Sequence, residues 1–417
     1  MSFTKNSSSL NNYIFIFLFI SPIYLWGITL NFVEIRHLIL ILFIPILYYR
    51  KFSEKDLLIL LLCIAIFFHK ISISKLNQIM DALLIFLYLF IIIKIIQQYY
   101  QKFLKTILGQ TNLFLILFIL SCVGITIYHQ YYFGIFFGHC IIGCFSLFNL
   151  FFLENSHLGM ISSSIIFYFL YLFSNNYKKI SIFLLSVFVL ICLLNYSLTF
   201  GASLIFNSLF ILFFFWKKIN LKYSIILILI TIFSSSIIIN NKLYLVKVQS
   251  IVEPIKKLFI FEQKEDEASK NLNQLDKIKE KPVKKNLSSD VWIKSLKVAL
   301  ISITNYPFGV GLNNFEIAHE KFINEISVNY PMTQKLNIQD ASNNLSKIIT
   351  EFGIFSLLLA YLLLRFIFSK NIDLGYKIFL LPNIFTQLLF RGAGYFNGGF
   401  IIFFIVMIYL IFEKNNK

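Results

Sequence analysis

Long uncharged apolar runs recur along this chain of 417 residues, and they constrain its fold more than any other feature. Hydrophobic residues make up 58% of the sequence, whereas soluble domains usually have about 45–50%. A helix can cross a bilayer because it satisfies its own backbone hydrogen bonds, and it needs about 20 apolar residues to do so. The sequence therefore predicts an all-α, polytopic membrane protein.

Twelve of these runs are candidates for transmembrane helices. They lie near residues 12–31, 36–49, 57–69, 82–97, 112–128, 158–174, 180–195, 199–216, 223–240, 351–369, 376–390 and 397–412. Several are shorter than about 20 residues, so their helices must extend into flanking loop residues. We expect about 12 transmembrane helices, divided into an N-terminal bundle (1–240) and a C-terminal group (351–417), with one large, mainly helical loop (241–350) between them.

The basic residues predict the orientation of these helices. The chain has 37 Lys and Arg against 20 Asp and Glu, a net charge of +17. In a soluble domain this charge would suggest nucleic acid, but in a membrane protein lysines collect on cytoplasmic loops. With a cytoplasmic N-terminus, the cytoplasmic segments hold sixteen basic residues, whereas the short outer segments hold only four: Arg36, Lys70, Lys75 and Arg391. This orientation places 241–350 and Arg391 on the same, outer side.

A further apolar run lies at 132–153. If it crossed the membrane, all loops on one side of it in the sequence would be placed on the wrong face of the membrane. We interpret it as an embedded or re-entrant segment on the outer side, because Gly134, Gly138 and Gly143 permit non-helical backbone that is buried in protein. Alternatively, 132–153 does cross the membrane and a second, unrecognised span elsewhere restores the predicted orientation.

Cofactor and metal motifs are absent from the sequence. The five Cys all lie in apolar stretches and are expected to act as small hydrophobic residues. Cys140 and Cys144 lie beside His139, but their number and spacing are wrong for zinc. No P-loop, GxGxxG or HExxH occurs, so we expect neither an ATP-driven pump nor a metalloprotease, and no cofactor.

Within the large loop, residues 263–285 are almost all charged or polar, which predicts a mobile helix or tether. The part from 286 to 350 is better organised. Its stretch 290–315 predicts an amphipathic helix with Lys294 and Lys297 on the polar side, ended by Pro307. Gly309 and Gly311 then permit a tight turn whose backbone N–H groups can approach an oxygen ligand. The alternative is an ordinary turn between two helices.

The stretch 339–353 predicts the start of the next helix. Asp340 is a suitable N-cap, and Asn343, Lys347 and Glu351 follow at a spacing of four, so they share one helix face. Amides can bind sugar hydroxyls and a lysine can bind phosphate. The alternative is a solvated first turn with an ordinary Lys–Glu pair.

Arg391 follows an apolar run and precedes a cluster of glycines: Gly392, Gly394, Gly398 and Gly399. An arginine costs a few kcal/mol in hydrocarbon, so one in this place is expected to be paired or functional. A guanidinium suits bidentate contact with phosphate, and the glycines would let an extended ligand approach the backbone.

The order of these features resembles the superfamily of O-antigen ligases and O-antigen polymerases. Its members share the pattern P-x-G-x-G-x-x-x-F, then His-Asn, then Glu-x-Gly, after a late large loop. The matching residues here are Pro307, Gly309, Gly311 and Phe315, then Asn343, then Glu351 and Gly353. The chain departs from the pattern at Ser342, where the family usually has a histidine. It also lacks the family's arginines in 198–204 and just upstream of Trp292.

The resemblance implies a metal-independent glycosyltransferase of the bacterial inner membrane, with its active site facing the periplasm. The donor would be a glycan on polyprenyl pyrophosphate. A ligase transfers it to a lipid A–core acceptor in lipopolysaccharide biosynthesis, and a polymerase transfers it to another lipid-linked repeat unit. Such chemistry needs cations for the leaving pyrophosphate and a base for the acceptor hydroxyl.

These roles can be assigned to residues of this chain. Arg391 is the first candidate cation, followed by Lys347, with Lys294 and Lys297 assisting. The candidate bases are Asp340, Glu316, His319 and Glu351. Gly309, Gly311, Ser342 and Asn343 are expected to contact substrate.

Two other functions remain open from the sequence. A flippase or transporter of the same glycolipid would more often carry charges within several spans and show duplicated halves. In this chain charges inside the spans are scarce, and the single late loop does not suggest duplicated halves. A relative without activity is the other alternative, because the usual histidine is missing.

Overall fold

The computed structural model describes residues 155–175, 182–194, 197–259, 287–326, 336–392, 394–395 and 399–413, with short pieces at 29–30, 33–34, 83–84, 87, 116 and 119. The predicted spans before residue 155, the predicted re-entrant segment 132–153 and the charged segment 263–285 lie outside these residues, apart from the short pieces.

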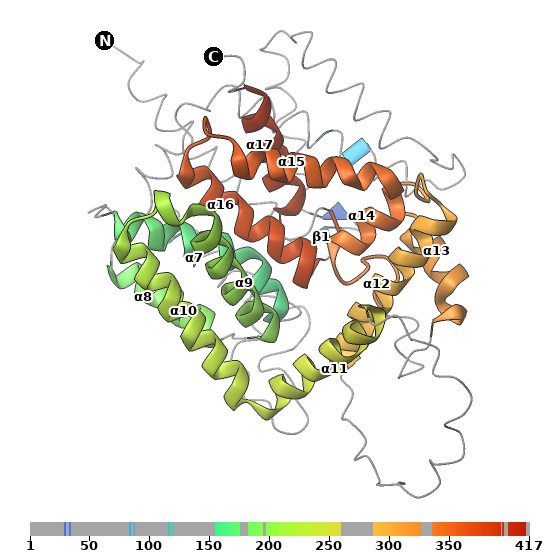
Figure 1. The fold of residues 1–417 in the computed structure, drawn as a ribbon, viewed down its shortest axis with the longest axis horizontal. Coiled ribbons are helices and arrows are strands. Elements are labelled where there is room, and N and C mark those ends of the chain that lie inside the picture. The colour runs from blue at the N-terminus through green and yellow to red at the C-terminus, as the bar shows by residue number, and fades with distance from the viewer. Residues whose placement is uncertain are drawn as a thin grey trace, which may run out of the picture.

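The described chain is almost entirely helical (Figure 1). Two short strands, β1 (Thr29–Leu30) and β2 (Val33–Glu34), pair antiparallel. The α-helices are α7 (Asn155–Ser174), α8 (Ile182–Leu194), α9 (Leu198–Phe215), α10 (Leu221–Asn240), α11 (Lys242–Phe259), α12 (Leu287–Asn305), α13 (Phe315–Phe322), α14 (Asn344–Phe352), α15 (Ser356–Phe368), α16 (Leu374–Phe385) and α17 (Phe400–Glu413). Short 3₁₀ helices are η1 (Trp216–Lys218), η3 (Ile323–Glu325) and η5 (Gly353–Phe355), and η6 (Thr386–Phe390) is a π-helix.

Three helical segments of the described chain are long and apolar enough to cross a membrane: Leu198–Lys218, Leu221–Asn240 and Asn344–Phe368. Three shorter apolar helices accompany them: Ser162–Ser174, Leu374–Phe390 and Phe400–Phe412. Each lies where the sequence predicts a span. The first two long segments begin at side-chain caps, because the Ser197 hydroxyl accepts from Phe200 N (3.1 Å) and the Asn220 amide accepts from Tyr223 N (2.7 Å).

Polar side chains join the apolar helices where they pack together. Ser203 on α9 and Thr386 in η6 share a hydrogen bond of 2.6 Å between their hydroxyls. Asn383 on α16 donates to Met160 O on α7 (3.0 Å). Such bonds hold membrane helices together because lipid offers these groups no partner. They fix α16 and η6, and therefore the chain that follows them, against α7 and α9.

Helices α11 to α14 lie to one side of this bundle (Figure 1). The Trp292 indole on α12 donates to Leu389 O in η6 (3.0 Å), which ties the loop to the C-terminal helices. The predicted position of Lys294 on the polar side of α12 is wrong, because this residue is only 1% exposed. Its ammonium instead donates to Leu336 O (2.7 Å), which is 42 residues further along the chain. Lys297 is half-buried.

Candidate functional site

Two of the sequence motifs pack against each other through their backbones. In the turn after α12, Val310 N donates to Thr350 O (3.0 Å) and Gly311 N donates to Glu351 O (2.9 Å). Ile354 N donates back to Pro307 O (2.8 Å). The P-x-G-x-G turn is therefore fixed on the end of α14, beside Glu351.

Gly309 and Gly353 make this contact possible. Both have left-handed backbones, with φ of 78° and 55°. A Cβ at Gly309 would overlap the Glu351 carbonyl, and one at Gly353 would overlap the Pro307 carbonyl. The N–H groups of Gly309 and Gly311 donate to Tyr306 O and Glu351 O within the protein. This geometry gives the glycines a role in close backbone approach, and their contact with substrate stays a prediction.

We expect Gly309→Ala to destabilise the protein by about 3 kcal/mol or more, because it adds backbone strain and a steric overlap in a packed contact. The measurement is the amount of folded protein recovered from membranes and its thermal stability in detergent. Gly201→Ala is the matched control, since it lies within α9, where a helix favours alanine. Equal stability of the Gly309→Ala variant and the wild type would contradict this role.

The predicted N-cap at Asp340 is wrong, because α14 begins three residues later. The cap is Asn343, whose side-chain oxygen accepts from Ser346 N (2.8 Å). Ala341 and Ser342 both have left-handed backbones, with φ of 57° and 62°, which a right-handed helix does not include, so α14 begins only after them. Asp340 lies beside the glycine-rich segment, with its Oδ1 3.2 Å from where a Cβ on Gly394 would lie.

Glu351 lies at the centre of a buried polar cluster. Its Oε2 accepts a hydrogen bond of 2.6 Å from the Tyr395 hydroxyl, and its Oε1 lies 3.8 Å from Lys347 Nζ. The predicted Lys–Glu pair therefore forms, but in the interior and not on a solvated turn, because Glu351 is fully buried. Lys347 Nζ also donates to Gln339 O (2.8 Å) and lies 5.2 Å from the Tyr395 ring centroid.

Tyr395 is the member of this cluster that sequence reasoning missed. Burial, and secondly the Glu351 carboxylate, raise the pKa of Tyr395 well above its usual value, so its hydroxyl keeps its proton and acts as a donor. The one available signal was its place three residues after Gly392, in the glycine-rich stretch; no motif distinguishes it.

The backbone around Arg391 lies along the start of α14. Arg391 N donates to Thr386 O (3.0 Å), which closes the π-helix, and Gly392 N donates to Ser342 O (2.9 Å). Gly392 packs so closely on Asn344 that a Cβ there would overlap the amide. Within the segment 391–395, whose described residues are 391, 392, 394 and 395, Arg391 therefore lies near Ser342, and Tyr395 lies against Glu351.

Several buried polar atoms of α14 have no hydrogen-bond partner among the described residues. They are Asn343 Nδ2, both amide atoms of Asn344, Ser346 Oγ and Thr350 Oγ1. Each such group costs about 1–3 kcal/mol when it is left unsatisfied. Buried polar groups need a partner, which can be water or the polar atoms of a bound ligand.

Lys294 and His319 form a neighbouring buried pair on α12 and α13. Burial lowers the pKa of Lys294 to about 8, against the opposing effect of Asp290. Burial, and then the Lys294 charge, lower the pKa of His319 to about 4. The imidazole packs on Phe315, with 6.2 Å between ring centroids. A pKa this low makes His319 a poor general base at neutral pH, and Glu316, the remaining candidate base, is exposed.

The lowered pKa of His319 predicts an acid-dependent loss of stability. The unfolded chain takes up a proton near pH 6.5, whereas the folded imidazole stays neutral until about pH 4, so stability falls as the pH drops through this window. We expect the His319→Leu variant to lose less stability than the wild type as the pH falls from about 6.5 to about 4. The measurement is the melting temperature in detergent between pH 7 and 4, with the exposed-site variant Ile317→Leu as control. Parallel pH profiles for His319→Leu and the wild type would exclude this contribution.

Together these features define a helical membrane protein with a buried polar site between α14 and the segment 391–395. Within the described residues, no group of three His, Cys, Asp or Glu could hold a metal ion. Comparisons of the chain with protein-family models, with curated proteins and with solved structures each gave no match.

Proposed function

We propose that this protein is a membrane glycosyltransferase similar to the O-antigen ligases. It transfers a glycan from polyprenyl pyrophosphate to a lipid A–core acceptor at the periplasmic face of the bacterial inner membrane. The observation that carries the proposal is the buried cluster of Glu351, Tyr395 and Lys347, with Arg391 one residue before Gly392, whose N–H donates to Ser342 O near the start of α14. It combines a carboxylate, a fixed hydroxyl donor and cations next to a membrane helix.

This set of groups matches the needs of the transfer. The acceptor hydroxyl oxygen forms a bond to the anomeric carbon, and the bond from that carbon to the pyrophosphate oxygen breaks. The hydroxyl proton passes to a carboxylate, and the electron pair leaves with the polyprenyl pyrophosphate. Arg391 and Lys347 supply positive charge for the leaving group.

Glu351 is the best candidate for the base. Tyr395 donates to Oε2 and thereby fixes the carboxylate, while Oε1 faces the Lys347 ammonium. The unpartnered polar groups of Asn343, Asn344 and Ser346 can bind sugar hydroxyls near the start of the same helix. Asp340, beside Gly394, is the second carboxylate of the site.

Ser342 occupies the position where the resemblance would place a histidine. Its hydroxyl lies 3.2 Å from Asn337 Nδ2, which donates to it, and a serine does not act as a base unaided. This substitution favours the second candidate function, a polymerase, in which the same site transfers the glycan to another lipid-linked repeat unit. A flippase is the third candidate, but these polar groups gather on the short helix α14, at one end of the apolar segment Asn344–Phe368, and not along the length of that segment.

Deletion of the gene, followed by gel analysis of the lipopolysaccharide, tests these alternatives. Ligation predicts the loss of all attached polymer, whereas polymerisation predicts a single attached repeat in place of a ladder. Re-expression of the wild type should restore the pattern, and the Glu351→Gln variant at the same membrane level should not. An unchanged pattern after deletion would contradict both functions.

A further inference from the structure

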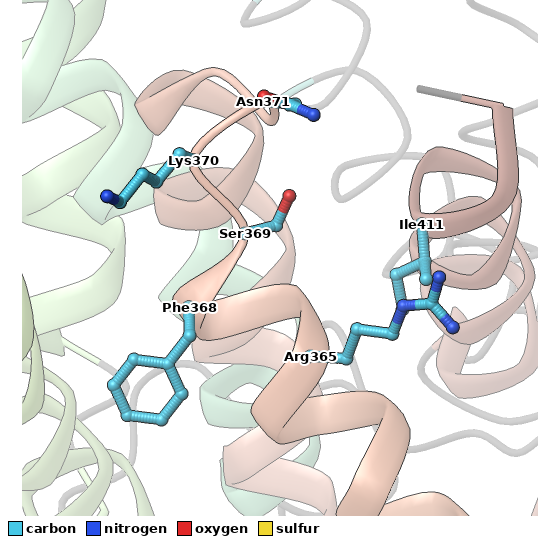
Figure 2. Close-up of a pocket in the computed structure, with 6 residues that line it drawn as sticks. All are labelled: Arg365, Phe368, Ser369, Lys370, Asn371 and Ile411. Atoms are coloured by element: carbon cyan, nitrogen blue, oxygen red, sulfur yellow. The ribbon is translucent and has the colours of Figure 1, made fainter. Parts of the chain in front are cut away.

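A second polar feature lies at the opposite end of α15 from Glu351. A cavity of about 360 Å³ opens there, lined by Arg365, Phe368, Ser369, Lys370, Asn371 and Ile411 (Figure 2). Because α15 has 13 residues and rises about 1.5 Å per residue, the cavity lies about 20 Å along the helix from the candidate active site. The cavity is at the end of Asn344–Phe368, a segment long enough to span a membrane. The ends of such a segment lie at the depth of the lipid headgroups.

The residues that line the cavity carry positive charge, as an anion-binding site requires. Two of its six lining residues are basic and none is acidic. The Arg365 guanidinium donates to the Tyr361 hydroxyl (3.3 Å) and lies 5.4 Å from the Phe412 ring, and no described carboxylate pairs with it. The nearby Asp373 is occupied as the cap of α16, where it accepts from Gly375 N (2.7 Å). A guanidinium has five donors, so Arg365 retains capacity for a phosphate.

The side chains in Figure 2 show where such an anion would lie. Arg365 reaches toward Ile411, and the Ser369 hydroxyl and the Asn371 amide lie on that side of the chain, whereas Lys370 points the other way. Arg365 is therefore the main cation, with polar support from Ser369 and Asn371. Lys370, which is exposed, adds positive charge at the rim.

An apolar stripe on α15 leads to this cavity. Leu357, Tyr361, Leu364 and Phe368 are each more than half exposed. Their spacing of four, three and four residues places them on one face of the helix. Phe368 ends the stripe and also lines the cavity. Phe368 packs on Phe214 of α9, whereas Arg365 lies over Phe412 of α17, and Figure 2 shows their side chains pointing to different sides. The stripe and the basic site therefore meet at the same end of α15.

We propose that this cavity binds the phosphate headgroup of an anionic phospholipid, with one acyl chain along the stripe. A phospholipid headgroup and an inorganic phosphate ion would both offer phosphate oxygens to the cavity, but only the lipid would also contact the apolar stripe. Basic pockets between membrane helices bind anionic headgroups by this combination of charge and depth. The proposal is independent of the glycosyltransferase activity.

The test uses the full chain purified in detergent. Native mass spectrometry would measure the binding of phosphatidylglycerol and of phosphatidylcholine to the wild type, Arg365→Gln, Arg365→Lys and Lys217→Gln. Lys217 is exposed at the end of a different span and does not line the cavity, so its variant is the matched control. We expect Arg365→Gln to weaken phosphatidylglycerol binding about tenfold, because it removes a charge-assisted hydrogen bond. Arg365→Lys should keep part of the binding, and Lys217→Gln should keep all of it.

Three results would overturn the proposal. The first is equal binding of both lipids by the wild type. The second is unchanged phosphatidylglycerol binding in Arg365→Gln. The third is complete displacement of the lipid by inorganic phosphate, which would make this a site for the free anion. If Arg365→Gln fails to insert, a double change on the stripe, Leu364→Ser with Phe368→Ser, is expected to weaken lipid binding without changing the cavity charge, and unchanged binding would contradict the assignment.

Discussion

Replacement of Arg391 by alanine is expected to lower glycan transfer by about a hundredfold or more, because a preorganised cation that stabilises the leaving group contributes about this much. Arg391→Lys should keep a trace of activity, since an ammonium supplies the charge but not the bidentate geometry. The measurement is transfer by membranes or purified protein from a polyprenyl-pyrophosphate-linked donor.

The Arg391 experiment needs a test of folding, because the backbone around this residue packs closely on α14. Gly392 N donates to Ser342 O there, so a misfolded variant would also be inactive. Equal membrane levels and equal melting temperatures of Arg391→Ala and the wild type establish that the fold is retained. Lys217→Gln, at an exposed position, is the control for loss of a positive charge. Full activity of a properly inserted Arg391→Ala protein would show that this arginine is not the cation.

The second large effect is expected at Glu351. Glu351→Gln should lower transfer by about a hundredfold to ten-thousandfold, the range that a general base contributes. Tyr395→Phe should lower it about tenfold, because it removes one hydrogen bond to a charged group but leaves the ring beside Lys347. The two variants and their double mutant form a cycle, and the predicted result is strong non-additivity, since the tyrosine acts through the glutamate.

Asp340→Asn distinguishes the two carboxylates of the site. Asp340 lies beside Gly394. Glu351, in contrast, is held in place by the hydrogen bond that it accepts from the Tyr395 hydroxyl. We therefore expect a smaller loss from Asp340→Asn than from Glu351→Gln. Normal transfer by Glu351→Gln, together with inactivity of Asp340→Asn, would reverse the assignment of the base.

The positions of the membrane helices could be predicted from the sequence because continuous apolar runs leave few alternatives. The runs 199–216 and 223–240 correspond to α9 (Leu198–Phe215) and α10 (Leu221–Asn240). The helix before Pro307 ends at Asn305, since a proline restricts the residue before it. The prediction of about 12 helices extends into the part of the chain that is not described, where it stays a prediction.

The start of α14 could not be predicted because it depends on backbone conformation. Asp340 is a good cap by residue type, but Ala341 and Ser342 adopt left-handed backbones that residue type does not favour. Lys294 was misplaced for a related reason. Its ammonium bonds to Leu336 O, 42 residues further along the chain, and no local pattern reports that contact.

The candidate site was predicted in its parts but not in its assembly. The helix spacing places Lys347 and Glu351 on one face, and their pair forms. The contact of the P-x-G-x-G turn with the Glu351 backbone, and the hydrogen bond from Tyr395, join residues about 40 positions apart in the chain. Tertiary contacts of this kind have no signature in a single sequence.

The location of the site outside the inner membrane is the central claim, and thiol labelling tests it most directly. Asp340→Cys and Lys370→Cys, each in a background without the five native cysteines, would be treated in intact cells with a maleimide that crosses the outer membrane but not the inner one. Both native residues are at least partly exposed, at opposite ends of α14–α15. We predict labelling at position 340 in intact cells, and at position 370 only after the inner membrane is permeabilised. The reverse pattern would place Glu351, Tyr395 and Arg391 near the cytoplasm and contradict the proposed reaction.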